Sequence, residues 1–213
     1  MKIFITIIFS VLTFIKVSAT AQYPDKIIYN DIEYSLLTNP LEKYFEKNEN
    51  QRPKGGVISS ALWRGYVATF EILDNQLYIK EIIIQISNEE SDKTEWKSVI
   101  DEIFPKIEDR KIKWFNGLLT LPYGELVNYV HMGYGSTYEN YTLIEMENGK
   151  LDKLKNLNFE EYTKLKDRQF EVYKKTNSYL EKKKELKKEG WKQKDIDRFL
   201  KSFETEFTEK LLQ

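Results

Sequence analysis

The chain has 213 residues, with 33 Lys or Arg against 34 Asp or Glu, and its formal net charge at pH 7 is −1. It contains no cysteine and one histidine, which excludes disulfide bonds, thiol catalysis and thiolate metal sites. A zinc site would need His131 with scattered Asp and Glu, and no calcium loop of the D-x-[DN]-x-[DN]-G type occurs, so we expect no metal and no cofactor.

The first residues have the form of a secretory signal peptide. Lys2 precedes an apolar run from Ile3 to Ile15, and Ala19-Thr20-Ala21 places small residues where signal peptidase cleaves. The run is short for a membrane span, and no cysteine follows that could carry a lipid. An uncleaved anchor helix is the alternative, because Lys16 interrupts the end of the run. The sequence predicts export to the periplasm or the extracellular space, with a mature chain over 22–213.

Alternating apolar residues and turn dipeptides predict antiparallel strands through the first two thirds of the chain. A small hairpin is expected over Ile27–Tyr29 and Ile32–Leu37, with Asn30-Asp31 as its turn. A longer hairpin is expected from about Ile58 to Leu73 and from Leu77 to Ile86, with its turn at Asp74-Asn75-Gln76. Apolar residues lie on both faces of its first strand, which places that strand in the middle of a sheet.

The middle of the chain is expected to add short helices and more strands. A helical turn is expected near Leu41–Phe45, and the spacing of Trp96, Val99, Ile100 and Ile103 predicts a helix over Thr94–Phe104 that covers the sheet. The strands expected after it are Ile112–Leu121, Glu125–Met132, Tyr138–Glu147 and Lys150–Leu154, with turns at Pro122-Tyr123-Gly124, Gly133–Thr137 and Asn148-Gly149.

From Asn158 onward the sequence predicts helix. Asn158 and Glu161 form a capping box, a first helix is expected to run to Lys188, and Gly190 is a helix stop. A second helix with one continuous apolar stripe is expected over Lys192–Leu212. The charge changes near the same boundary, from −7 over residues 22–150 to +4 over residues 151–213.

These patterns predict three parts: a signal peptide over 1–21, a sheet domain over 22–157, and a C-terminal helical hairpin over 158–213. The fold class expected for the mature chain is α+β. It consists of a mostly antiparallel, twisted sheet of five to seven strands with one covering helix, followed by the hairpin.

The single histidine lies in the stretch YVHMGYGSTY, residues 129–138. His131 and Ser136 could approach across a tight loop, so a hydrolase-like enzyme that uses His131 with a carboxylate is one hypothesis. The chain has no G-x-S-x-G elbow, however, and Gly133 and Gly135 suit a turn. We favour a strand-end His131 that is held by backbone or by a tyrosine hydroxyl, as a packing residue or at an interface, and a Tyr134 that points outward from the loop tip.

Other candidate sites are weaker. Gly133-Tyr134-Gly135 lacks the third glycine and the lysine of a phosphate-binding loop. The basic run Lys182–Lys188 contains Glu185, is flanked by Glu181 and Glu189, and ends a helix, where cations are favoured, so we expect no nucleic-acid partner. Arg64 lies in an apolar stretch and needs a partner, for which the sequence offers four glutamates or a ligand carboxylate. The four glutamates are Glu71, Glu81, Glu125 and Glu139.

Two stretches, ALWRGYVATFEILDNQLYI over 61–79 and GLLTLPYGELVNYVHMGYGSTYENYTLIEMENGK over 117–150, are similar to sequences of known proteins. They resemble an uncharacterised family of bacterial proteins that share a W-R-G-Y strand and an H-M-G-Y-G-S-x-Y-E loop. The resemblance covers roughly residues 39–157 and implies no established activity. Small β-rich bacterial proteins of this kind are often suspected of neutralising toxins, which is an association and not a mechanism.

The leading hypothesis is an exported, non-enzymatic binding protein with a protein partner, of which an immunity protein against a toxin is the more specific form. After cleavage of the signal peptide no stable membrane span is expected. Tyr, Trp and Arg side chains dominate the binding energy of protein interfaces. The residues expected to form the binding surface are Arg64, Tyr66, His131, Tyr134, Ser136 and Tyr138.

Overall fold

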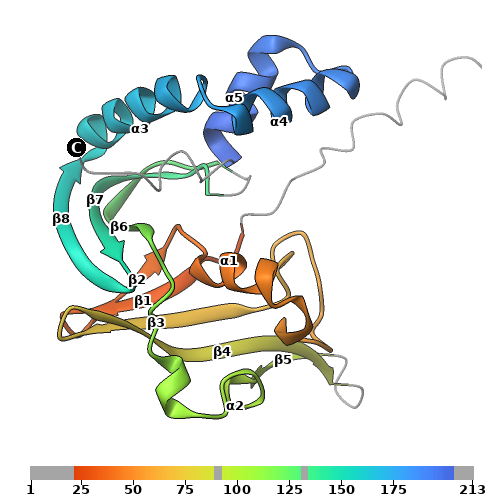
Figure 1. Ribbon diagram of the computed structural model, residues 1–213, viewed down its shortest axis with the longest axis vertical. Helices are drawn as coiled ribbons and strands as arrows, with labels where there is room; N and C mark the ends of the chain where they lie inside the picture. Colours follow the sequence, from red (N-terminus) through yellow and green to blue (C-terminus); the bar gives the residue numbers. More distant parts are fainter. Residues whose placement is uncertain (1–21, 89–92, 131–133, 204–213) are drawn as a thin grey trace, which may run out of the picture.

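The computed structural model describes residues 22–88, 93–130 and 134–203. The predicted signal peptide and His131 lie outside these ranges. Within them, no helix has both the length and the apolar composition that crossing a bilayer requires. The predicted α+β fold class is confirmed: early strands and a helix lead into a large, mostly antiparallel sheet, and helices follow it (Figure 1).

In the described part of the chain, eight strands form one sheet. Their order is β2-β1-β3-β4-β8-β7-β6, with β5 added to the edge of β4. The β1–β3 pair is parallel and the others are antiparallel. The strands are β1 (Asp25–Tyr29), β2 (Ile32–Leu36), β3 (Val67–Leu73), β4 (Gln76–Asn88), β5 (Lys93–Ser98), β6 (Gly117–Asn128), β7 (Thr137–Glu147) and β8 (Lys150–Asn158).

Turn chemistry explains the three tight hairpins. Both central residues of each turn have positive φ: 51° and 61° at Asn30-Asp31, 50° and 61° at Asp74-Asn75, and 50° and 73° at Asn148-Gly149. Such turns match the right-handed twist of the flanking strands, and Asn, Asp and Gly are the residues that tolerate these angles. All three turns were predicted from the sequence and are confirmed.

The sheet bends so strongly that its two ends meet. Figure 1 shows β6, β7 and β8 standing above β1, β3 and β4. The two halves share the short β4–β8 pairing at Gln76. At the opposite side the chain after β2 reaches β6, where the backbone N–H of Leu37 donates to the Thr120 carbonyl at 2.9 Å. The Thr38 hydroxyl donates to the Leu118 carbonyl at 3.1 Å and accepts from the Thr120 N–H at 3.2 Å. The sheet therefore encloses its own core.

The helix that covers this core is α1 (Pro40–Lys47), which extends the helical turn predicted near Leu41–Phe45. Its apolar face buries Leu41 and Phe45 among the inward-facing side chains of β1, β3 and β4. Pro40 stands at the start of the helix, where its missing N–H costs nothing.

The covering helix predicted over Thr94–Phe104 is wrong for most of its length. Residues 93–98 form β5, all of whose side chains are exposed, and only Ile100–Ile103 form the short helix α2. The segment KTEWKS also alternates charged and uncharged residues with a period of two. The open edge of β4 supplies ladder hydrogen bonds to residues that have no apolar face to bury, and this tertiary pairing overrides the helical spacing.

Two strand predictions also need correction. The strand expected from Ile58 begins only at Val67, and the preceding residues form a loop in which Gly65 has φ of 77°. The two strands expected on either side of Pro122-Tyr123-Gly124 are one continuous strand, β6. The register shift between Tyr123 and Leu126 shows that this segment is a bulge and not a turn.

The C-terminal region is helical, with one break more than predicted. Its helices are α3 (Phe159–Tyr173), α4 (Asn177–Lys188) and α5 (Gln193–Phe203). The predicted capping box of Asn158 and Glu161 is confirmed at the start of α3, and Gly190 has the left-handed φ of 90° expected of a stop. The unpredicted break falls at Thr176, whose hydroxyl accepts from the Tyr179 N–H and caps α4.

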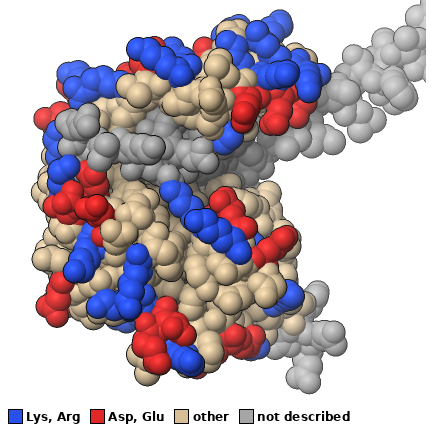
Figure 2. All heavy atoms as spheres, viewed as in Figure 1, with Lys and Arg blue, Asp and Glu red and all other residues tan. Residues whose placement is uncertain are grey.

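The helix α3 docks on the sheet, whereas α4 and α5 pack on the end of α3. The Tyr162 ring of α3 stacks on Tyr141 of β7 at a centroid distance of 3.8 Å, and Leu165 is buried beside Leu157. A separate small cluster around Phe170 joins the three helices. Figure 2 shows many Lys and Arg over these helices at the top, with Asp and Glu among them, and both charge signs over the sheet as well.

Candidate functional site

The predicted site residue Arg64 is buried and bound within the fold. Its Nη2 donates to the Tyr23 carbonyl at 2.9 Å and pairs with the Asp25 carboxylate at 3.2 Å. Its Nη1 donates to the Tyr134 hydroxyl at 2.9 Å. The predicted need for a partner is confirmed, but the partner is Asp25 and none of the four glutamates proposed. The parallel pairing of β1 beside β3 brings this carboxylate to the loop before β3.

Tyr134 therefore points inward, and the prediction that it points outward from the loop tip is wrong. Its hydroxyl accepts from Arg64 and donates to the Asn39 side chain at 2.9 Å. Burial raises the pKa of Tyr134 to about 12, although the positive charge of Arg64 acts in the opposite direction. Tyr134 therefore links the loop that follows β6 to the start of α1.

Tyr66 belongs to a second buried network next to the first. Its ring is fully buried, and its hydroxyl donates to Glu42 of α1 at 2.7 Å. Glu42 in turn holds Arg52 in a two-pronged ion pair with both distances at 3.0 Å. Burial, with the negative charges of Asp25 and Glu42, raises the pKa of Tyr66 well above its usual value. These contacts position α1 and the loop after it.

Ser136 and Tyr138 are also engaged locally. The Ser136 hydroxyl accepts from the Val130 N–H at 3.1 Å and donates to the Val130 carbonyl at 3.3 Å, so it closes the loop between β6 and β7. Tyr138 packs edge-to-face on Tyr141. The two residues line a small cavity of about 160 Å³ together with Tyr134. His131 lies outside the described residues, so its role stays a prediction.

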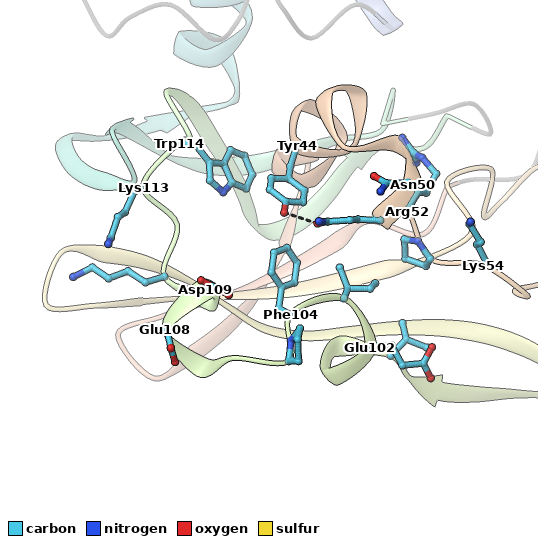
Figure 3. A pocket seen from close by; sticks show the side chains of 16 residues that line it. Tyr44, Asn50, Arg52, Lys54, Glu102, Phe104, Glu108, Asp109, Lys113 and Trp114 are labelled. Atoms are coloured by element: carbon cyan, nitrogen blue, oxygen red, sulfur yellow. Dashed lines mark hydrogen bonds between the residues drawn. The ribbon is translucent and has the colours of Figure 1, made fainter.

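A larger cleft of about 870 Å³ lies beside α1, and sequence reasoning missed it (Figure 3). One wall is formed by Tyr44 of α1 and by the 3-10 helix η2 (Glu49–Gln51) with the loop that follows it. The other wall comes from α2, from the 3-10 helix η3 (Ile107–Arg110), and from the chain leading to Trp114. Two segments about 60 residues apart in sequence thus form one cavity.

The floor of the cleft is aromatic. The Tyr44 ring lies 5.4 Å from Phe104 and 5.2 Å from Trp114, centroid to centroid. The Tyr44 hydroxyl donates to Gln51 at 2.6 Å, as the dashed line in Figure 3 shows. Burial and the negative charge of Asp109 raise the pKa of Tyr44. Phe104 is buried, whereas Tyr44 and Trp114 are only partly buried and face the cleft.

Charged side chains surround this floor. Four basic residues line the cleft, namely Arg52, Lys54, Lys111 and Lys113, and three acidic ones, Glu102, Glu108 and Asp109. Arg52 is neutralised by Glu42, and Glu102 pairs with Lys97 at 2.9 Å. Within the described ranges, no group of three or more His, Cys, Asp or Glu side chains is placed to hold a metal ion. The arrangement suits the binding of a ligand with apolar and charged groups.

No family model, no curated protein and no solved structure matches this chain. The resemblance of its two motifs to an uncharacterised bacterial family stays a prediction from the sequence. In the structure, the W-R-G-Y motif forms a loop that holds Arg64 and Tyr66 in the two buried networks, not a strand.

Proposed function

We propose that the protein is an exported binding protein whose protein partner enters the cleft beside α1. The observation that carries this proposal is the aromatic floor of Tyr44, Phe104 and Trp114 inside a cavity of about 870 Å³. Ligand sites commonly measure about 300–1,000 Å³ and combine an apolar lining with a few placed polar groups. The cleft also offers Tyr, Trp and Arg, the residue types that dominate interface energies.

The binding surface predicted from the sequence is less suited to a partner than the cleft beside α1. The polar groups of Arg64, Tyr66 and Tyr134 bind other parts of the same chain, so a partner would have to break the fold to reach them. Trp114 and Lys113 are accessible without any rearrangement. An immunity protein against a toxin is the more specific form of this proposal, and it rests on the motif resemblance alone.

The test is a pull-down from native envelope extract with residues 22–213 as bait. We expect one stoichiometric protein partner, which the Trp114→Ala variant loses and the Trp191→Ala variant keeps. Trp191 is 40% exposed and lies between α4 and α5, outside the cleft lining. Tyr134→Phe is expected to keep the partner as well. Because Trp114 also packs against the core, Lys113→Glu serves as a second cleft variant that leaves the core intact.

A partner that is retained by both cleft variants would contradict the proposal. So would a partner that is lost with Tyr134→Phe while both cleft variants keep it, because the interface would then lie at the loop between β6 and β7. Circular dichroism and thermal unfolding of each variant establish that the bait is folded.

A further inference from the structure

We infer that the cleft takes an extended, acidic polypeptide segment, with carboxylates on both sides of an aromatic or apolar side chain. This inference rests on the proposed binding function and specifies its ligand. Figure 3 shows Lys54 and Lys113 on opposite sides of the aromatic floor, with Tyr44, Phe104 and Trp114 between them. The cleft therefore offers two positively charged ends and an apolar centre.

The positive ends are free to accept a ligand. Lys54 and Lys113 are exposed, and among the described residues no carboxylate pairs with them or with Lys111. Since Arg52 and Glu102 are already paired, the charges left for a ligand are these three lysines against Glu108 and Asp109. The surrounding sheet domain is acidic, at −7 over residues 22–150, so this cleft departs from its surroundings in the sign of its charge.

The centre of the cleft disfavours an anion. Asp109 lines the same cleft as Tyr44 (Figure 3), and its negative charge contributes to the raised pKa of the tyrosine hydroxyl. A ligand carboxylate over the floor would be repelled by Asp109, whereas an aromatic or apolar group would pack on Tyr44 and Trp114. The order of groups that fits the cleft is therefore acidic, apolar, acidic.

A polypeptide satisfies this order better than a small anion does. A small anion neutralises one end and leaves the aromatic floor exposed to water. An extended chain spans about 3.3 Å per residue, so a few residues reach from one lysine end to the other. Tyr44 and Trp114 then supply apolar contact, and the lysines supply orientation and attraction over distance.

Two random copolymers provide the probes: one of glutamate and tyrosine, the other of lysine and tyrosine. Binding to residues 22–213 is measured by isothermal titration and by the change in tryptophan fluorescence, at about 50 mM and about 300 mM salt. We expect the acidic copolymer to bind at least about tenfold more tightly than the basic one, and to weaken as salt screens the lysines. Equal binding of the two copolymers, or preference for the basic one, would overturn the inference.

A charge-matched pair of variants locates the binding. The cleft variant is Lys54→Glu with Lys113→Glu, and the control is Lys106→Glu with Lys150→Glu, two exposed lysines outside the cleft lining. Both variants change the net charge equally. We expect the cleft variant to lose about tenfold or more in affinity for the acidic copolymer and the control to lose less than about threefold. Equal losses would show attraction to net charge alone and would overturn the inference.

The pull-down separates this inference from the proposed function. If the acidic copolymer does not bind but binding of the envelope partner still depends on Trp114, the inference of an acidic segment is wrong. The proposal that a partner binds in the cleft then stands. If neither the copolymer nor a Trp114-dependent partner binds, both are wrong.

Discussion

At the scale of single residues, Asp25 has an unusual environment for a carboxylate. Its side chain is fully buried, accepts from the Ala68 N–H at 2.9 Å, and is paired with Arg64. Its second carboxylate oxygen and the Nε of Arg64 have no hydrogen-bond partner among the described residues. Burial raises the pKa of Asp25 to about 6, because the attraction of Arg64 and the Ala68 hydrogen bond offset only part of the desolvation cost.

This raised pKa gives the protein a specific pH dependence. An acid whose pKa is higher in the folded state than in the unfolded state contributes stability at low pH and loses it as the pH rises through the folded value. A rise from 3.8 to about 6 corresponds to roughly 3 kcal/mol. We expect the free energy of unfolding of the wild type, minus that of Asp25→Asn, to fall by this order between about pH 4 and pH 7.

Urea unfolding of both proteins across this pH range measures the difference. The subtraction removes the contributions of the other carboxylates, which both proteins share. Two stability profiles that stay parallel from about pH 4 to pH 7 would contradict the raised pKa of Asp25.

The sequence indicated that Arg64 needs a partner, because a guanidinium in an apolar stretch cannot stay unpaired. It did not identify Asp25, 39 residues earlier in the chain, because that contact depends on the parallel pairing of β1 with β3. Tyr134 was misplaced for a related reason. A glycine-rich loop predicts exposure of its tip, but only the fold shows a buried cation beneath the tyrosine hydroxyl.

At the scale of elements, the sequence predicted correctly those features that depend on neighbouring residues. The three hairpin turns and the capping box depend on residues within a few positions of each other, and all are confirmed. The helix predicted around Trp96 is wrong because this segment has little apolar surface to bury and pairs as a strand with the edge of β4. The break at Thr176 was missed, although threonine is a residue type that commonly begins helices. The structure shows that its hydroxyl accepts from the Tyr179 N–H.

The docking of α3 on the sheet gives an element-level prediction. Tyr162 stacks on Tyr141 at 3.8 Å, and its removal leaves a cavity between α3 and β7. We expect Tyr162→Ala to lower the free energy of unfolding by about 3 kcal/mol. The matched control is Val172→Ala on the same helix, where the side chain is 66% exposed and a change within about 0.5 kcal/mol is expected. Denaturant unfolding measures both, and similar losses in the two variants would mean that α3 is not held by this stack.

At the scale of the whole molecule, the ends of the sheet are joined by the backbone hydrogen bond of Leu37 and by the buried hydroxyl of Thr38. Thr38 satisfies both the carbonyl of Leu118 and the N–H of Thr120. The cleft also depends on the fold of the whole molecule, because its walls come from residues 44–54 and 99–114 and no short sequence motif predicts it. Sequence patterns predicted the elements, but the pairing of distant segments created both the closed sheet and the candidate site.

Replacement of Thr38 tests this closure. Thr38→Val keeps the side-chain volume and leaves two buried backbone groups without their partner, so we expect a loss of about 2 kcal/mol in the free energy of unfolding. Thr142→Val is the control, because the Thr142 hydroxyl donates to the exposed side chain of Asn156. Its expected effect is within about 0.5 kcal/mol. Hydrogen exchange should also become faster at the Leu37 and Thr120 amides in Thr38→Val, and unchanged protection there would argue against a closed sheet.

The same closure sets the order in which the protein can fold. Residues 37 and 38 complete their hydrogen bonds only with residues 118–120, about 80 positions later, so the sheet cannot close until β6 is present. Contacts of such sequence separation slow folding. In an exported protein of the kind that we propose, the sheet could not close and complete its core while β6 had still to cross the membrane.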